Sequence, residues 1–248
     1  MADQVAIVTG ASRGIGFAIA QRFVAEGYKV CITGRDAQAL DQAAKDLGGA
    51  EVAIGVAGKG DDADHRAAVI DTVLGQFGPV TALVNNIGIN PAYGPLGSLD
   101  LGAARKMFDV NVLGTLGWAQ EALRGGLADT GGSIVNISSI AGKTLSPNTA
   151  AYSASKAGLQ ALTACMAREV GLYGIRVNAL CPGLVDTSRM DDLGRGDVWN
   201  ETVKALVPLG RAGTGEDIAH AVVYLSSDEG SWVTGQSWNV DGGTVVQH

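Results

Sequence analysis

The stretch Val5-Ala6-Ile7-Val8-Thr9-Gly10-Ala11-Ser12-Arg13-Gly14-Ile15-Gly16 decides the fold. Its first four residues form an apolar, β-branched run that is typical of a strand buried on both faces of a parallel sheet. The glycines that follow allow a sharp backbone turn and the close approach of a ligand. The helix that begins at Ile15 then offers free N–H groups and a partial positive charge to a pyrophosphate. The spacing is GxxxGxG rather than GxGxxG, and its place directly after the first strand favours nucleotide binding over an ordinary strand-to-helix turn.

Short apolar runs alternate with longer helical patterns along the whole chain. This alternation predicts an α/β fold in which a doubly wound, Rossmann-type parallel sheet carries helices on both faces. No linker, repeat or low-complexity tract divides the sequence, so we expect residues 1–248 to form a single dinucleotide-binding and catalytic domain. The expected strands are Val5–Val8, Val30–Thr33, Val52–Val56, Ala82–Asn85, Ile134–Ile137, Val177–Leu180 and Ser237–Val240, and the expected helices are Ile15–Glu26, Ala37–Leu47, Asp64–Gln76, Ala103–Ala122, Tyr152–Leu172 and Glu216–Ser226.

Charge and hydropathy argue against several classes of partner. The net charge of −7 and the isoelectric point near 4.9 disfavour nucleic acid or an anionic membrane as the main partner. No apolar run reaches the roughly 18 residues that a membrane span needs. The sequence also opens without the basic and apolar regions of a signal peptide. We therefore expect a soluble, cytoplasmic protein that binds neither nucleic acid nor membrane.

The cysteines and histidines form no metal-binding pattern. Cys31, Cys165 and Cys181 include no CxxC pair, and they are better explained as buried small side chains in a reducing compartment than as a disulfide framework. The three histidines are scattered along the chain. The sequence therefore predicts no metal site.

A second informative stretch is Tyr152-Ser153-Ala154-Ser155-Lys156, with Ser139 thirteen residues before Tyr152. Residues four apart lie on one face of a helix, so Tyr152 and Lys156 can point into one site. A free tyrosine has a pKa of roughly 10, and a nearby ammonium favours the phenolate and lowers that pKa. A lone Tyr/Lys pair is common on helix surfaces, but the other motifs of this chain favour acid–base chemistry.

The end of the second expected strand bears on the choice of cofactor. In a dinucleotide fold, an acidic residue there binds the ribose 2′-hydroxyl of NAD. This chain instead has Gly34 followed by Arg35, with Arg13 in the glycine loop, and two guanidinium groups suit a 2′-phosphate. The sequence therefore predicts NADP(H), with NAD(H) the less favoured cofactor. NAD(H) remains an alternative because Asp36, an acidic residue, lies next to Arg35.

Residues Thr187–Arg211 form the one long stretch without clear periodicity. They follow an expected strand, and ligands of open α/β sheets lie beyond the carboxyl ends of the strands. A long loop inside a compact domain is often functional. We therefore interpret this segment as a substrate lid rather than as a surface excursion.

Taken together, the motifs resemble the short-chain dehydrogenase/reductase family in its single-domain form, over essentially the whole chain. Nearest in appearance are its 3-oxoacyl reductase-like and ketone reductase members. The resemblance implies an oxidoreductase that interconverts a ketone and a secondary alcohol with NADP(H). The motifs are the TGxxxGxG loop Thr9–Gly16, Asn85-Asn86-Ile87-Gly88, Asn111 in Asp109-Val110-Asn111-Val112, Ile137-Ser138-Ser139, the pair Tyr152 and Lys156, Cys181–Thr187, and Gly235–Gly243.

The resemblance implies a role for each of four residues. Tyr152 would be the general acid for ketone reduction or the base for alcohol oxidation, and Lys156 would lower the pKa of Tyr152 and hold the nicotinamide ribose. Ser139, rather than Ser138, would hydrogen-bond the substrate oxygen, and Asn111 would hold a water that links Lys156 to solvent. The implied cofactor-binding residues are Gly10, Ser12, Arg13, Gly14, Ile15, Gly16, Arg35, Asn86, Gly88, Tyr152, Lys156, Pro182, Gly183, Val185 and Thr187.

At the adenine end the chain departs from the family pattern. Ile87 stands where alanine is usual. Lys59 falls where an aspartate usually bonds the adenine amino group, and Asp61 or Asp62 could replace that contact. The sequence alone leaves open how the adenine is held.

Two loops bear on the substrate. Carrier-protein reductases tend to carry basic residues before the serine strand and before the sixth strand. Here those places read Leu127-Ala128-Asp129-Thr130 and Gly171-Leu172-Tyr173-Gly174. We therefore expect a free small-molecule ketone or alcohol as the substrate, not an acyl group on a carrier protein.

Two alternatives stand beside an NADP(H)-dependent ketone reductase. One is an NAD(H)-dependent alcohol dehydrogenase of the same family, and the other is a non-catalytic, nucleotide-sensing member that keeps the fold. Four intact catalytic candidates argue against the second alternative. The family, together with the apolar C-terminal strand and the nearby Trp232 and Trp238, also leads us to expect a homotetramer.

Overall fold

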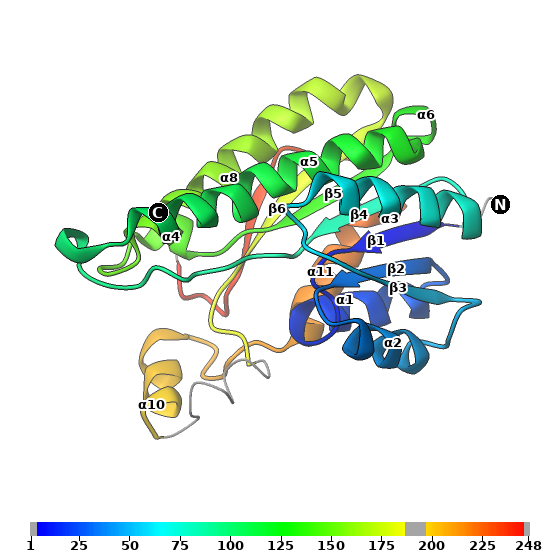
Figure 1. The fold of residues 1–248 in the computed structure, drawn as a ribbon. Coiled ribbons are helices and arrows are strands. Elements are labelled where there is room, and N and C mark those ends of the chain that lie inside the picture. Colours follow the sequence, from blue (N-terminus) through cyan, green and yellow to red (C-terminus); the bar gives the residue numbers. More distant parts are fainter. Residues whose placement is uncertain (1–3, 187–196, 246–248) are drawn as a thin grey trace.

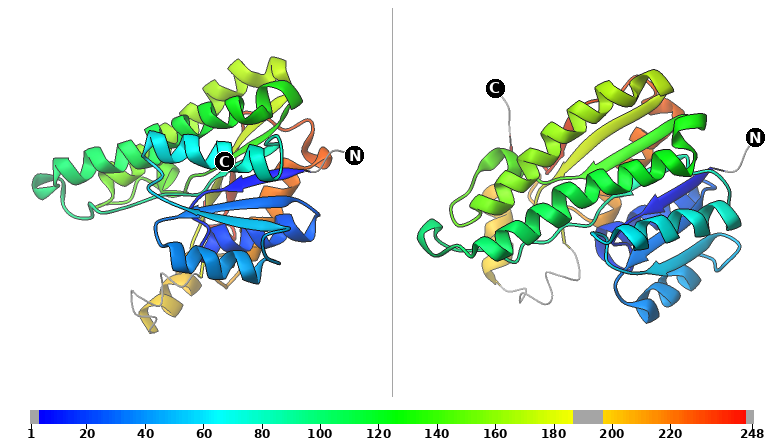
Figure 2. Two further views of the ribbon diagram at one scale, coloured as in Figure 1. Left: turned by 45° about the vertical axis from the view of Figure 1, so that its right-hand side comes forward. Right: turned by 45° about the horizontal axis from the view of Figure 1, so that its top comes forward.

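The side chains of β1 (Val5–Val8) show how the central sheet is buried. Val5 and Ile7 belong to the hydrophobic core on one face of the sheet, whereas Ala6 and Val8 belong to the core on the other face. Because successive side chains of a strand point to opposite faces, helices must cover both faces. The computed structural model, which describes residues 4–186 and 197–245, has this arrangement (Figures 1 and 2).

The described strands pair in parallel in one seven-stranded sheet, in the order β3-β2-β1-β4-β5-β6-β7. The order reverses between β1 and β4, and open α/β sheets bind ligands at such a switch point, beyond the carboxyl ends of the strands. The predicted Rossmann-type α/β fold is confirmed. Besides β1, the strands are β2 (Lys29–Gly34), β3 (Ala53–Ala57), β4 (Ala82–Asn85), β5 (Gly132–Ile137), β6 (Ile175–Pro182) and β7 (Ser237–Val240).

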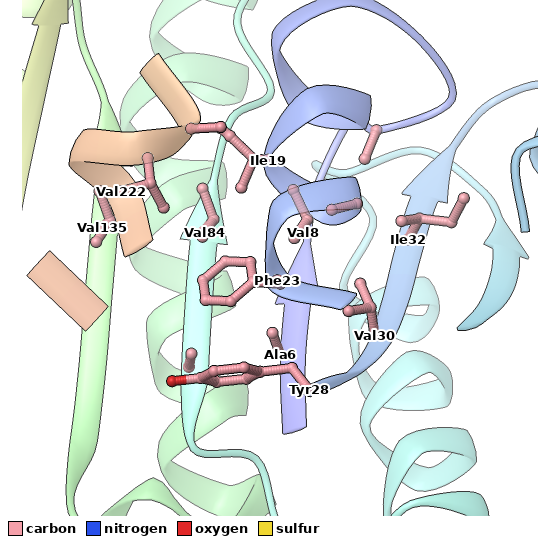
Figure 3. Close-up of a cluster of buried hydrophobic side chains, with 14 of the residues drawn as sticks. Ala6, Val8, Ile19, Phe23, Tyr28, Val30, Ile32, Val84, Val135 and Val222 are labelled. Atoms are coloured by element: carbon pink, nitrogen blue, oxygen red, sulfur yellow. The ribbon is translucent and has the colours of Figure 1, made fainter. Parts of the chain in front are cut away.

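Two layers of helices cover the sheet. The core under the first layer contains Phe23, whose ring centre lies 4.7 Å from that of Tyr28 (Figure 3). The core under the second layer contains the almost fully buried Trp118. The first layer consists of α1 (Gly14–Ala25), α2 (Ala37–Asp46) and α11 (Gly215–Ser226), and the second of α3 (Ala63–Gln76), α5 (Gly114–Ala122) and α8 (Ala150–Val170).

The single helix predicted for Ala103–Ala122 is interrupted in the structure. It begins earlier, as α4 (Leu101–Phe108), because the Asp100 carboxylate accepts hydrogen bonds from two backbone N–H groups of its first turn at 2.6 and 3.2 Å. A π-helical turn, Asp109–Leu113, then separates α4 from α5. Such turns are rare and occur frequently at functional sites. This one carries Asn111.

Most other boundaries lie within two residues of the prediction. For example, α8 begins at Ala150 rather than at Tyr152, and α11 begins at Gly215 rather than at Glu216. The short elements were not predicted from the sequence. These are the 3₁₀ turns Leu96–Ser98, Gly171–Tyr173 and Asp228–Gly230, the π turn Leu123–Leu127, and the helices α6 (Ala128–Thr130), α7 (Ala141–Thr144) and α10 (Asp197–Leu206).

The segment interpreted as a lid, 187–211, lies partly outside the described residues. Its described part begins with α10, which stands apart from the two helix layers (Figure 1). The chain on either side of the segment is joined by a parallel bridge between Val185 and Gly213. The backbone N–H of Asp186 donates to the carbonyl oxygen of Gly213 at 2.7 Å. The two ends of the segment are therefore held together beside β6.

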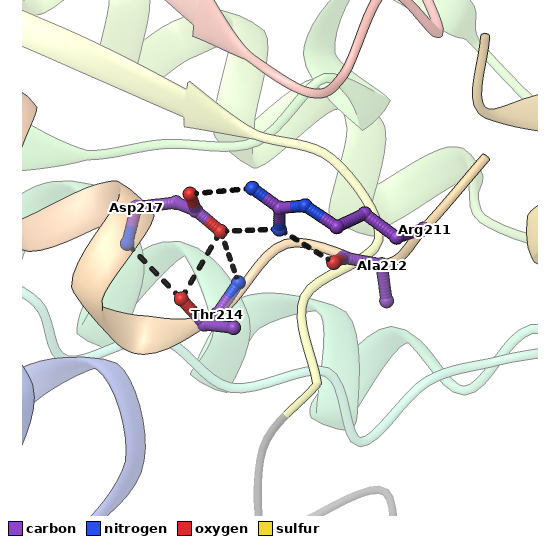
Figure 4. A network of polar contacts seen from close by, with 4 residues as sticks. All are labelled: Arg211, Ala212, Thr214 and Asp217. Carbon is purple, nitrogen blue, oxygen red and sulfur yellow. Dashed lines mark hydrogen bonds and ion pairs between the residues drawn. The ribbon is translucent and has the colours of Figure 1, made fainter. Parts of the chain in front are cut away.

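A polar network fixes the second of these ends to α11 (Figure 4). The guanidinium of Arg211 binds both carboxylate oxygens of Asp217, at 2.7 and 2.9 Å. Asp217 and Thr214 form a reciprocal capping box at the start of α11. The strong pairing with Arg211 lowers the pKa of Asp217 well below its usual range.

Candidate active site

The glycine loop leaves the carboxyl end of β1 and turns directly into α1. Gly10 (φ 64°) and Gly14 (φ 62°) adopt the left-handed conformation that favours glycine. A Cβ on Gly16 would lie 2.5 Å from the carbonyl oxygen of Gly10, so the first turn of α1 packs against the loop itself. The N-terminus of α1 therefore opens onto the crevice beyond β1, where its free N–H groups can face a diphosphate.

Asn86 fastens this loop to the end of β4. Its side-chain amide donates to the carbonyl oxygens of Thr9, at 3.0 Å, and Gly10, at 2.9 Å. Its backbone N–H donates to the hydroxyl of Thr9 at 2.9 Å. These bonds join the two chain segments on either side of the switch point, so Asn86 shapes the crevice that it also lines.

A cavity of about 490 Å³ lies against the glycine loop. Among the described residues, four cationic side chains line it, those of Arg13, Arg35, Lys59 and Lys106, and Asp61 supplies a carboxylate. Because the chain as a whole has a net charge of −7, this concentration of cations is local and suits an anionic ligand. The predicted cofactor contacts that line this cavity are Gly10, Ser12, Arg13, Gly14, Ile15, Gly16, Arg35, Asn86 and Gly88.

A second cavity, of about 310 Å³, adjoins the first. Ile15, Asn86 and Gly88 line both cavities, so the two form one groove. This second part of the groove brings together most of the remaining predicted site residues. They are Ser139, Tyr152, Lys156, Pro182, Gly183 and Val185, and Ser138, Leu184 and Trp199 lie beside them.

Lys156 is buried at the base of the groove, with 3% of its surface exposed. Its Nζ donates to the carbonyl oxygen of Ile137 at 2.9 Å and lies 5.9 Å from the centre of the Tyr152 ring. Burial lowers the pKa of Lys156 to about 8. A Cβ on Gly88 would lie 3.1 Å from this Nζ, so glycine lets the loop after β4 pass close to the amine.

The two serines after β5 have different partners. Ser138 is buried, and its hydroxyl donates to the carbonyl oxygen of Lys156 at 3.0 Å and accepts from the Gln160 amide at 3.2 Å. Ser139 is half-buried, and its Oγ accepts from the backbone N–H of Ala141 at 3.1 Å. That contact leaves the hydroxyl proton of Ser139 available for a substrate oxygen. The geometry therefore suits Ser139 better than Ser138 for binding substrate.

Asn111 lies in the π turn and has no exposed surface. Its Oδ1 accepts from the backbone N–H of Ile89 at 2.9 Å, and its Nδ2 donates to the Ile89 carbonyl at 3.0 Å and to Ser155 Oγ at 3.1 Å. Its backbone carbonyl accepts from the Thr115 hydroxyl at 3.1 Å. The side chain thus clamps the loop after β4 to helix α8. Its predicted role in holding a water stays a prediction.

Three acidic residues at the adenosine end differ in what they contact. The Asp36 carboxylate accepts a backbone N–H of the first turn of α2 at 3.1 Å, and the Asp62 carboxylate caps α3 in the same way at 3.0 Å. Asp61 instead lines the cavity and pairs with Lys106, and the hydrogen bond from Lys106 lowers the pKa of Asp61. Of the two aspartates considered for the adenine contact, Asp61 is the one that faces the cavity.

Several residues of the groove were not predicted from the sequence. Lys106 and Val110 reach it from α4 and the π turn, and Trp199 reaches it from α10. Lys106 lies 45 residues from its partner Asp61, and no local pattern reveals such a pairing. Thr187, predicted to contact the nicotinamide amide, falls outside the described residues.

Within residues 4–186 and 197–245, no three His, Cys, Asp or Glu side chains are grouped so that they could hold a metal ion. No helix in that same part of the chain has the length and apolar character needed to cross a membrane. All three cysteines are free thiols. Cys31 and Cys181 are buried, as expected, but Cys165 is exposed because it falls on the outer face of α8.

Several known proteins are similar to this chain over nearly its whole length. A family model described as enoyl-(acyl carrier protein) reductase matches residues 10–245. The chain is similar to the NADP-dependent (R)-specific alcohol dehydrogenase of Lentilactobacillus kefiri, with 39% identity over 98% of this chain and 97% of that protein. It is also similar to the 3-oxoacyl-(acyl-carrier-protein) reductase of Chlamydia muridarum, with 37% identity over 98% of both chains. A solved short-chain type dehydrogenase/reductase from Mycobacterium ulcerans superposes with a TM-score of 0.92 at 33% identity, covering 98% of this chain and 90% of that one.

Proposed function

The chain belongs to the short-chain dehydrogenase/reductase family and is an oxidoreductase that acts on CH–OH groups. We propose that it interconverts a ketone and a secondary alcohol with NADP(H), and that Tyr152 is the general acid and base. The observation that carries this proposal is the groove in which Ser139, Tyr152 and Lys156 gather beside the glycine loop. A concave site that contains a titratable residue with a shifted pKa is a strong candidate for catalysis.

The residues of the groove fit the proposed chemistry. A bound nicotinamide would supply hydride to the carbonyl carbon or accept it from the alcohol. Ser139 would donate its hydroxyl proton to the substrate oxygen as negative charge develops there. Tyr152 would give its phenolic proton to the same oxygen during reduction and take it back during oxidation. Lys156, held by the carbonyl of Ile137, would place an amine close to the phenol and favour its ionised form.

The groove also fits a dinucleotide, and three observations support NADP(H). Arg13 and Arg35 both line the cavity beside the glycine loop, where their guanidinium groups can reach a 2′-phosphate. The carboxylate of Asp36, the residue that left NAD(H) open, is used as the cap of α2. The similar alcohol dehydrogenase of Lentilactobacillus kefiri is NADP-dependent. NAD(H) stays the alternative cofactor.

For the substrate we propose a free ketone or the matching alcohol. The walls of the second cavity include apolar side chains of Leu184, Val185 and Trp199. The loops that precede β5 and β6 present Asp129 and Tyr173 rather than basic residues, so they offer no positive charge to an acidic carrier protein. A carrier-bound acyl substrate, as named for the relative from Chlamydia muridarum, is the competing possibility.

Replacing Tyr152 by phenylalanine tests the central claim, because it removes the proton donor and keeps the ring. A general acid or base typically contributes ~10²–10⁴-fold in rate, so turnover of a ketone with NADPH should fall by that factor while NADPH binding stays intact. Tyr93→Phe, at a tyrosine that is 70% exposed, is the matched control. A variant that keeps more than about a tenth of wild-type turnover would falsify the role of Tyr152. A wild type that binds NADPH but reduces no ketone would support the nucleotide-sensing alternative.

We further propose that residues 1–248 act as one domain, that the protein assembles as a homotetramer, and that it works in the cytoplasm. The continuous sheet supports the first point. The free thiols support a reducing compartment.

A further inference from the structure

Ser155 lies between Tyr152 and Lys156 on α8, and its side chain is fully buried. Its hydroxyl donates to the carbonyl oxygen of Tyr152 at 2.8 Å and accepts from Asn111 Nδ2 at 3.1 Å. The hydroxyl therefore connects the π turn to the part of α8 that carries the acid–base pair. Ser155 does not appear among the described residues that line the groove, so any effect on chemistry must pass through these neighbours.

The other contacts of Asn111 explain why this hydroxyl matters. A side-chain amide has two N–H donors and one carbonyl oxygen. Asn111 uses the oxygen and one donor on the backbone of Ile89 and the second donor on Ser155. Removing the Ser155 hydroxyl would leave a buried N–H without a partner, which is unfavourable. Asn111 would then shift to find another acceptor, and Ile89 would shift with it.

The loop that would shift is the one that meets Lys156. Asn86, Gly88 and Ile89 all line the cavity beside the glycine loop. A Cβ on Gly88 would lie 3.1 Å from Lys156 Nζ and 3.9 Å from Asn111 Oδ1, so backbone, amine and amide converge at this point. A small displacement of the loop would therefore change its position relative to the amine.

We propose that Ser155 is a positioning residue that sets the register between the loop Asn86–Ile89 and the helix segment that carries Tyr152 and Lys156. The proposal rests on the proposed function, because it concerns the alignment of the same site. Serine hydroxyls in helices often bond to the carbonyl three or four residues earlier without any functional effect. Ser155 differs from that ordinary case because its oxygen also receives the amide of Asn111.

The chain offers a matched control in Ser153, which lies on the same turn of α8 and is also buried. Its hydroxyl contacts only the nearby hydroxyl of Thr149, at 2.9 Å, among the described hydrogen bonds.

Ser155→Ala should lower kcat by about tenfold, since misplacing reacting groups by 1 Å can cost ~10²-fold, and should leave the KM for the ketone within about twofold of wild type. Ser153→Ala should change both constants by less than about twofold. Equal effects of the two substitutions on kcat would overturn the proposal.

A double-mutant cycle separates positioning from general destabilisation. If Ser155 acts through Asn111, Ser155→Ala should cause no further loss of kcat in an Asn111→Ala background. Losses that multiply in the double variant would show that Ser155 acts independently, and the proposal would be wrong. Thermal unfolding and NADPH binding are measured for each variant, so that a folding defect is recognised.

If Ser155→Ala does not fold, Ser155→Cys serves instead, because the thiol is similar in size and is a weak donor and acceptor. Its kcat should then lie below that of Ser153→Cys, and equal values would overturn the proposal. A wild type inactive toward every ketone would contradict the proposed function and this inference together. An active wild type with matching Ser155 and Ser153 variants would overturn this inference alone.

Discussion

The burial of Lys156 serves the proposed mechanism but destabilises the folded protein. Its amine is buried and bonds to the backbone carbonyl of Ile137, and burial lowers its pKa to about 8. A buried ammonium loses its hydration, which disfavours the charged form. The same burial keeps the amine close to Tyr152, where the proposed mechanism needs it.

Because burial disfavours the charged amine, we expect Lys156→Met to change Tm by an amount that depends on pH. The folded-state pKa of Lys156, about 8, lies below the ordinary lysine pKa of 10.5. Between pH 8 and pH 10.5, the unfolded chain therefore binds more protons than the folded chain. The contribution of Lys156 to the free energy of unfolding therefore rises with pH across this window. Lys156→Met should raise Tm most at or below pH 8, by at least about 2–4 °C, the shift that 1 kcal/mol produces at this chain length. The gain should shrink toward pH 10.5. A Tm difference that is the same at pH 7 and pH 10 would contradict this expectation, and Lys45→Met, at an exposed lysine, is the control.

Cofactor selection is also decided at the residue scale. A hydrogen bond to a charged group contributes roughly 1.5–3 kcal/mol, so Arg35→Ala should weaken NADPH binding by roughly 10- to 100-fold. Binding of NADH should hardly change, because NADH has no 2′-phosphate. The dissociation constants of both cofactors, measured for wild type, Arg35→Ala and the control Arg168→Ala on the exposed surface of α8, provide the test. Equal losses for the two cofactors, or a wild type that prefers NADH, would refute the assignment.

At the scale of elements, the bridge between Val185 and Gly213 and the Arg211–Asp217 pair hold the ends of the segment that carries α10. Arg211→Gln removes the bidentate contact and keeps Asp217 as the cap of α11. Because the pair is exposed, the free energy of unfolding should change little. Trp199 lines the groove from α10, so the KM for the ketone should rise several-fold with little change in kcat.

The exposed pair Arg22–Glu26 provides the control for this prediction. Arg22→Gln should have a similarly small effect on stability and no effect on the KM for the ketone. If both variants leave KM unchanged, the Arg211–Asp217 pair stabilises α11 without positioning α10.

The elements also show where sequence reasoning succeeds. The bounds of β1, β4 and β7 match the prediction, because short apolar runs between turn residues mark buried parallel strands. The capping box at Thr214 was predictable because it depends only on residues three apart. Tyr152 and Lys156 were predicted from their spacing and Ser139 from the family resemblance, and all three line one groove.

The features that could not be predicted from the sequence depend mainly on tertiary contacts. The π turn at Asn111 interrupts a continuous helical pattern, and the bonds that accompany it go to Ile89 on another segment. Likewise, the pairing of Lys106 with Asp61 arises only once α4 is placed beside the loop after β3. α10 is amphipathic, but its pattern covers only Asp197–Leu206 and lies inside a stretch that was interpreted as one loop, so the helix was missed.

At the scale of the whole molecule, the C-terminal edge of the sheet argues for assembly. β7 is the last strand in the sheet order, and the outer edge of such a strand presents backbone groups that can pair or must be covered. Trp238 in β7 is partly buried by stacking on Tyr224, with ring centres 5.7 Å apart. Trp232, just before β7, is 98% exposed. Aromatic side chains such as this exposed indole are enriched at protein–protein interfaces.

We therefore expect a homotetramer with dihedral symmetry, in which a two-fold axis brings two copies of this edge together. Sedimentation equilibrium at micromolar concentration should give four times the chain mass of 25.3 kDa. Trp232→Glu should shift the protein to smaller species, because two carboxylates would then be buried near the axis without partners. Leu74→Glu, at another exposed apolar residue, on α3, should leave the tetramer intact. A wild type that sediments only as a monomer would refute the assembly. A tetramer that survives Trp232→Glu would place the interface elsewhere, and Trp232 would then be an exposed residue that assembly does not explain.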